Sequence, residues 1–95
     1  MSEFKPLDPL LHSQLRLAVM SLLISVESAE FTFLKEKTES TAGNLSVQLD
    51  KLEKAGYIEI EKSFKGKRPL TTAKITKHGV NAFETYVNAL KNYIS

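Results

Sequence analysis

Residues 49–58 read LDKLEKAGYI, and residues 65–79 read KGKRPLTTAKITKHG. In the first stretch, leucines recur at helical spacing until Gly56, which is placed to end a helix in the left-handed conformation. Residues 57–61 then alternate in part between apolar and polar side chains, as a strand does. A basic turn over residues 65–69 leads into the threonine-rich residues 70–75, the expected return strand. The two stretches predict a helix followed by a β-hairpin with a basic tip.

Two shorter helical patterns precede this unit. Asp8 and Pro9 form a helix start signal, so we expect a first helix over residues 8–27. Residues 28–31 interrupt this helix and are expected to be extended. A short helix, capped by a threonine, is expected over residues 33–38, and a tight turn follows it.

The third and the last helix both begin at a threonine. Thr41 is the expected N-cap of the third helix, which runs to residue 55, and Thr76 is the expected N-cap of the last helix, which ends at residue 94. The buried stripe of the third helix is expected to consist of Ala42, Leu45, Leu49 and Leu52.

The composition describes one small domain over residues 1–95. The chain is 42% hydrophobic and 25% charged and contains no cysteine, which excludes disulfides and thiolate zinc sites. His12 and His78 are far apart and lack the spacing of metal ligands, so neither a metal nor a cofactor is expected. No leader pattern is visible at the amino terminus, and the apolar residues 15–26 are too few to span a bilayer. We therefore expect a cytoplasmic protein without membrane contact.

Both terminal helices carry apolar residues on two faces, which is more than one small core covers. Because large exposed apolar patches are uncommon on monomers, the second stripes favour a homodimer interface. The alternative is that the two helices pack on each other within one subunit. The residues expected at the interface are Leu10, Leu17, Met20, Ile24, Ala82, Tyr86, Ala89 and Tyr93.

Positive charge is concentrated around the hairpin. Residues 62–77 hold six lysines and arginines and no acidic residue, so with a net charge of +2 the rest of the chain carries −4. Such a run can be a plain solvated face, but localised cations beside an exposed helix are what DNA phosphates require. The order of the elements predicts an α+β, mostly α, winged helix-turn-helix with a two-stranded β-hairpin wing and long N- and C-terminal helices. The helix-turn-helix would occupy residues 33–55 and the wing residues 57–75.

The outward face of the third helix is polar and small near its amino end. Asn44 can pair with an adenine edge or a phosphate, and Val47 can contact a thymine methyl group. Thr41 can equally act as a plain N-cap. Asp50 and Glu53 would be repelled by phosphates, so only the first two turns are expected to enter a groove. The outward-facing or flanking residues are Ser40, Thr41, Gly43, Asn44, Ser46, Val47, Lys51 and Lys54.

The motifs at residues 49–58, 67–72 and 75–79 resemble those of small winged-helix transcriptional regulators related to the MarR and ArsR groups. The resemblance runs from about residue 10 to residue 90. It implies a homodimer, joined by helices 8–27 and 76–94, that binds a pseudo-palindromic operator with one recognition helix in each half-site. It also adds Gln48 to the groove-facing residues and places the tip of the wing at Lys65, Lys67 and Arg68.

Other functions have weaker support. No catalytic residue set, phosphate-binding glycine loop or paired carboxylates are visible, so an enzyme is not expected. A winged-helix docking module that binds protein and not DNA is the alternative function. The sequence names no small-molecule effector and leaves open whether one exists. It does not separate a repressor from an activator, although a bare DNA-binding dimer favours repression.

Overall fold

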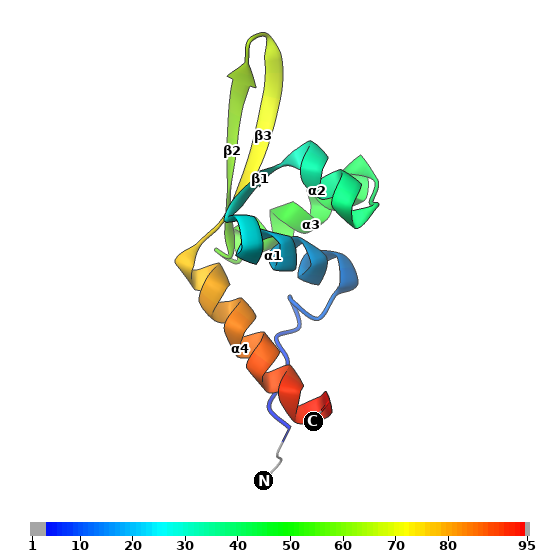
Figure 1. The fold of residues 1–95 in the computed structure, drawn as a ribbon, viewed down its shortest axis with the longest axis vertical. Coiled ribbons are helices and arrows are strands. Elements are labelled where there is room, and N and C mark those ends of the chain that lie inside the picture. Colours follow the sequence, from blue (N-terminus) through cyan, green and yellow to red (C-terminus); the bar gives the residue numbers. More distant parts are fainter. Residues whose placement is uncertain (1–3, 95) are drawn as a thin grey trace.

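The computed structural model describes residues 4–94 as four helices and three strands (Figure 1). In chain order they are α1 (Gln14–Val26), β1 (Ser28–Glu30), α2 (Phe31–Thr38), α3 (Ala42–Lys54), β2 (Ile58–Lys65), β3 (Arg68–Ile75) and α4 (Lys77–Ile94). This order confirms the mostly helical, winged helix-turn-helix class expected from the sequence.

The sheet is antiparallel, with the strand order β1-β3-β2. The extended segment expected at residues 28–31 is therefore a third strand. It pairs with β3 only at residues 72–74, whereas β2 pairs with β3 along its whole length, from Ile58 opposite Ile75 to Lys65 opposite Arg68. The distal half of the hairpin consequently stands beyond the helices as a two-stranded wing (Figure 1).

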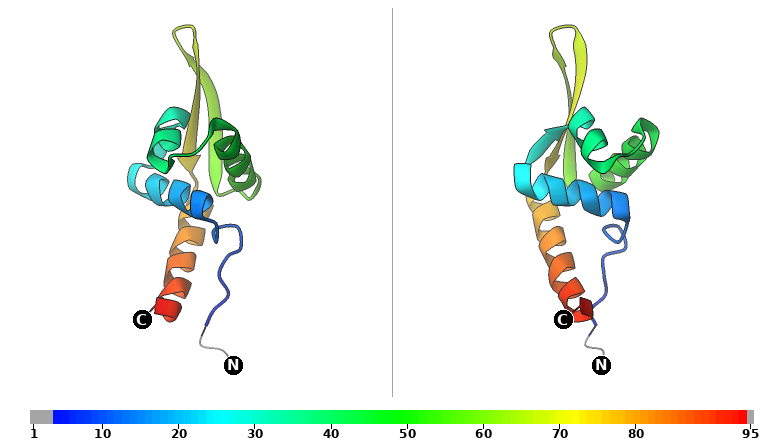
Figure 2. Two further views of the ribbon diagram at one scale, coloured as in Figure 1. Left: turned by 90° about the vertical axis from the view of Figure 1, so that its right-hand side faces the viewer. Right: turned by 45° about the vertical axis from the view of Figure 1, so that its right-hand side comes forward.

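The core lies where α1, α2 and α3 meet the base of the sheet (Figures 1 and 2). α4 leaves this body on the side opposite the wing, and the amino-terminal segment runs beside it (Figure 2). The Tyr93 hydroxyl donates to the Lys5 carbonyl at 2.8 Å, which joins that segment to the end of α4. The largest fully buried side chains are those of Leu11, Val19, Met20, Leu23, Leu34, Leu45, Leu52 and Ile58.

The first helix begins six residues later than expected. The Asp8 carbonyl accepts from the amides of Leu11 and His12, and its carboxylate accepts from the Leu10 amide at 2.9 Å. These bonds close one isolated turn, after which Ser13 is extended and α1 starts at Gln14. The start signal at Asp8 was read correctly as a cap, but it caps a turn and not the helix.

Two further expectations were wrong. The short helix begins at Phe31, because the chain leaves β1 directly into α2 with Glu30 as its N-cap. Ala42 is exposed, because it is the first residue of α3 and precedes the buried stripe of Leu45, Leu49 and Leu52.

Three capping contacts fix α3 between the wing and α4. The Thr41 hydroxyl accepts from the Asn44 amide at 3.1 Å, as an N-cap does. Gly56 has φ +79°, which confirms its expected left-handed conformation. The Thr76 hydroxyl accepts from the Gly79 amide at 2.9 Å and donates to the Gly56 carbonyl at 2.6 Å, so one side chain caps α4 and ties it to the end of α3.

Candidate nucleic-acid interface

The amino-terminal half of α3 presents a small, polar surface. Thr41, Gly43, Asn44 and Ser46 are exposed, and Val47 is 52% exposed among them. Leu45 and Leu49 face the core and thereby set the rotation of the helix. The expected groove-facing residues thus share one surface, on which Ser40 and Gln48 are half-buried and Lys51 is exposed.

Gly43 borders open space within residues 4–94. No heavy atom lies within 4 Å of the position that a Cβ would take there. Glycine inside a helix costs about 1 kcal/mol relative to alanine. An external surface that approaches the helix backbone closely would benefit from the missing side chain.

Gln48 is held by two side chains, one of which the sequence reasoning missed. The Arg16 guanidinium donates to Gln48 Oε1, and its Nε donates to the Leu10 carbonyl at 2.6 Å. Gln48 Nε2 in turn donates to Asn44 Oδ1 at 3.0 Å. A signal for it was present in the sequence, because Arg16 is the single charged residue of α1.

Three cations of the wing lie together at its tip. Lys65, Lys67 and Arg68 are exposed around a turn in which Gly66 has φ +65°. Phe64, which the sequence reasoning also missed, is 73% exposed next to them. The run of aromatic and basic residues at 64–68 gave a visible signal for it.

A hollow of about 420 Å³ lies between α3 and the wing. Ser46, Asp50 and Glu53 line it from α3, and Lys62 and Thr71 line it from the strands. Because Asp50 and Glu53 repel phosphates, the carboxyl-terminal half of α3 is the less suitable half for a nucleic acid.

Lys54 does not serve as a free cation on this side. Its ammonium group lies 2.9 Å from the Asp50 carboxylate, and this hydrogen bond and charge raise the pKa of Lys54. The outward-facing Lys54 is therefore less suited than Lys51 to contact a phosphate.

These features can be compared with known proteins. A family model described as "Winged helix DNA-binding domain" matches residues 15–94. The chain belongs to the winged-helix DNA-binding domain family. The fold and the family are those of DNA-binding regulators and not of enzymes.

This winged-helix chain is similar to one protein by sequence and to another by structure. An uncharacterized protein of Methanocaldococcus jannaschii is 42% identical over 76 residues, which cover 80% of this chain and 83% of the relative. The structure of a transcriptional regulator homologue from Pyrococcus horikoshii OT3 superposes with a TM-score of 0.84 at 28% identity, over 90% of this chain and 84% of that one. The resemblance to small winged-helix regulators is thereby confirmed.

The likeness to the MarR family is one of fold. A MarR-family transcriptional regulator from Silicibacter pomeroyi superposes with a TM-score of 0.68 at 16% identity, over 86% of this chain. That alignment spans 54% of the larger regulator.

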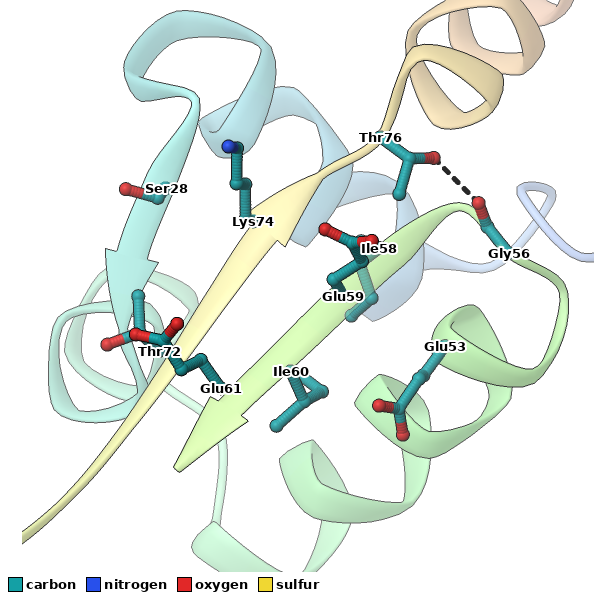
Figure 3. A pocket seen from close by; sticks show the side chains of 10 residues that line it. All are labelled: Ser28, Glu53, Gly56, Ile58, Glu59, Ile60, Glu61, Thr72, Lys74 and Thr76. Carbon is teal, nitrogen blue, oxygen red and sulfur yellow. Dashed lines mark hydrogen bonds between the residues drawn. The ribbon is translucent and has the colours of Figure 1, made fainter. Parts of the chain in front are cut away.

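A second hollow of the winged-helix domain, of about 780 Å³, opens beside the sheet (Figure 3). Glu53 from α3 and Glu59 and Glu61 from β2 line it together with one cation, Lys74 (Figure 3). Its net negative charge makes it unsuitable for phosphate. Within residues 4–94 no group of three histidines or carboxylates is arranged to hold a metal ion.

Tyr57 joins the amino-terminal turn to the junction of α3 and β2. Its hydroxyl donates to Asp8 Oδ2 at 2.5 Å, and its ring lies 5.0 Å from the His78 ring. Burial, followed by the hydrogen bond to Asp8, raises the pKa of Tyr57 to about 12. These contacts give His78 a packing role.

The terminal helices use their apolar stripes differently from the expected interface. Met20, Tyr86 and Ala89 are buried in the core of the single chain, and Tyr86 also bonds His12 at 2.9 Å. We therefore correct the expected interface by removing these three. Of the other expected residues, Ile24 and Tyr93 are exposed and Leu10, Leu17 and Ala82 are half-buried.

Among residues 4–94, every helix is too short or too polar to span a membrane.

Proposed function

We propose that this chain binds double-stranded DNA sequence-specifically and acts as a transcriptional regulator. The amino-terminal half of α3 enters the major groove, where Asn44, Ser46 and Val47 meet base edges and Thr41 and Lys51 meet the backbone. Arg68 at the wing tip reaches the adjacent minor groove, flanked by Lys65 and Lys67.

The observation that carries this proposal is the pairing of two surfaces. The amino-terminal half of α3 is small and polar, and the lysine paired with Asp50 lies at the other end of the helix. The neighbouring wing exposes Lys65, Lys67 and Arg68 together at its tip. The larger acidic hollow lies at the base of the sheet. In the hollow between α3 and the wing, the carboxylates of Asp50 and Glu53 come from the carboxyl-terminal half of α3. This separation of charge favours one face for phosphate.

Fluorescence anisotropy with a generic duplex tests the proposal. Lys51, Lys65, Lys67 and Arg68 would lie close to phosphates in this arrangement. Four such cations give an expected slope of about −3 to −4 in log K against log salt for each chain that binds. Absence of binding at low salt would favour the docking module instead. Selection from random duplexes then yields the preferred sequence.

We propose that the regulator acts as a homodimer on a pseudo-palindromic site. The support is an exposed apolar surface over α1 and α4, where a hollow of about 450 Å³ is lined by Ile24, Phe83 and Val87. The apolar residues that end the two helices, Val26 of α1 and Ile94 of α4, are 46% and 76% exposed. Two copies joined through this surface would hold two α3 helices for two half-sites.

The mass in solution tests the dimer. Light scattering at micromolar concentration is expected to give twice the chain mass of 10.6 kDa. A Val87→Asp variant is expected to halve that mass because a carboxylate would be buried without a partner. A wild-type mass near 10.6 kDa would contradict the dimer.

Repression is the regulatory direction that we propose. A dimer bound at its site can block a promoter by occupancy alone. A reporter gene behind the selected sequence is expected to fall in expression when the protein is present, and a rise would identify an activator.

A further inference from the structure

Arg16 begins a series of side-chain hydrogen bonds that ends on the proposed DNA-facing side of α3. Arg16 bonds the Leu10 carbonyl and Gln48 Oε1, and Gln48 Nε2 bonds Asn44 Oδ1. Arg16 and Gln48 are half-buried, whereas Asn44 is exposed. This series of hydrogen bonds thus connects the amino-terminal segment with the proposed recognition surface.

The chemistry of arginine decides which atom donates and which accepts in each of these hydrogen bonds. A guanidinium group has donors and no acceptor, so Gln48 must turn its carbonyl oxygen toward Arg16. The amide group of Gln48 is then left to face Asn44, which must accept with its own carbonyl oxygen. Asn44 Nδ2 is then the remaining donor of an exposed side chain, and no residue among 4–94 accepts from it.

We propose that Arg16 is a positioning residue for base readout, which makes Asn44 present its Nδ2 donor to DNA. This inference rests on the proposed function of the chain as a DNA-binding regulator. Base edges with an acceptor in the major groove are guanine N7 and O6, adenine N7 and thymine O4. Cytosine offers a donor there, so the base that faces Asn44 is selected against cytosine.

The remaining lone pair of Asn44 sharpens the preference. Oδ1 accepts one hydrogen bond from Gln48 and keeps capacity for a second. Adenine matches both groups, because its N7 accepts from Nδ2 while its N6 donates to Oδ1. The arrangement therefore favours adenine at this position.

Side-chain amide spectra of the free protein test the positioning step without DNA. In the wild type, the amide protons of Gln48 are expected to exchange slowly and to differ from those of a free glutamine. Arg16→Met is expected to return them toward free values, and Arg16→Lys, which keeps a donor, to restore part of the difference. Free-amide signals for Gln48 in the wild type would overturn the inference and leave DNA binding untouched.

Selection from random duplexes tests the readout. Arg16→Met is expected to relax the preference against cytosine at one position in each half-site, by about tenfold, with partial rescue by Arg16→Lys. An unchanged preference with DNA binding intact overturns this inference alone. Failure of the wild type to bind any duplex overturns the proposed function.

Exchange of donor and acceptor between residues 48 and 44 gives the most decisive test. Gln48→Glu keeps an acceptor for Arg16 but has no donor for Asn44, so Asn44 Nδ2 turns inward and its oxygen faces DNA. Cytosine, which donates from N4, is then expected to become acceptable at that position. Asn92→Asp, on the exposed end of α4, carries the same change of net charge and is expected to leave the preference unaltered. Continued exclusion of cytosine by Gln48→Glu would overturn the inference.

Discussion

Gly79 packs directly against the carbonyl oxygen of Tyr57. A Cβ at residue 79 would lie 2.1 Å from that oxygen and 3.0 Å from a side-chain carbon of Ile75. The contact brings the first turn of α4 onto the start of β2, where Thr76 also joins α4 to Gly56. The direction in which α4 leaves the body therefore depends on a residue without a side chain.

Gly79→Ala is expected to destabilise the fold by about 2–4 kcal/mol, because backbone must move to admit a methyl group. Urea unfolding measured by circular dichroism gives the change in the free energy of unfolding. A loss below about 0.5 kcal/mol would show that α4 shifts freely.

Gly43→Ala is the matched change at a helical glycine with open space around it, and its two effects have opposite signs. Stability is expected to rise by about 0.5–1 kcal/mol, because alanine is the better helix former. Affinity for the selected duplex is expected to fall severalfold, because the methyl group would stand between the helix and the groove. Unchanged affinity would indicate that DNA does not approach α3 at this point.

Tyr57 gives the unfolding free energy a dependence on pH in the alkaline range. The unfolded chain releases the phenol proton near the ordinary pKa of 10, whereas the folded chain holds it until about 12. The stabilisation is complete below pH 10 and is lost as the pH rises toward 12. Because the side chain is partly exposed, the effect is on the order of 1–2 kcal/mol.

Thermal unfolding between pH 8 and pH 11.5 measures this dependence. Tyr57→Phe is expected to reduce the loss of stability above pH 10, while Tyr93→Phe, at an exposed tyrosine, keeps it. Equal slopes for Tyr57→Phe and the wild type would contradict the assignment.

The sequence predicted the elements wherever a local signal decided them. The caps at Thr41 and Thr76 and the left-handed Gly56 are short-range chemistry, and each is confirmed by its own hydrogen bond or backbone angle. The start of α1 was misplaced because an aspartate caps an isolated turn and a helix with the same bonds.

The dimer interface was less predictable, because it depends on which apolar stripes of the terminal helices pack within one subunit. Met20 and Tyr86 have the periodicity of an exposed stripe, yet long-range packing buries both in the single chain. Arg16 and Gln48 are 32 residues apart in sequence, so their contact follows only from the packing of α1 on α3. Helical spacing predicts which residues share a face of a helix, but not which element packs against that face.

Arg68→Ala is the most direct test of the wing. Arg68 is exposed at the first position of β3, opposite Lys65, so its side chain has little part in folding and the free energy of unfolding is expected to change by less than about 0.5 kcal/mol. Loss of a guanidinium group from a narrow groove is expected to weaken DNA binding about five- to tenfold and to reduce the salt slope by about 1. Lys54→Ala removes the same charge from a lysine already paired with Asp50, so it is the control expected to change affinity less. Anisotropy titrations at several salt concentrations compare the two variants, and equal losses of affinity would mean that net charge, and not contact by the wing, governs binding.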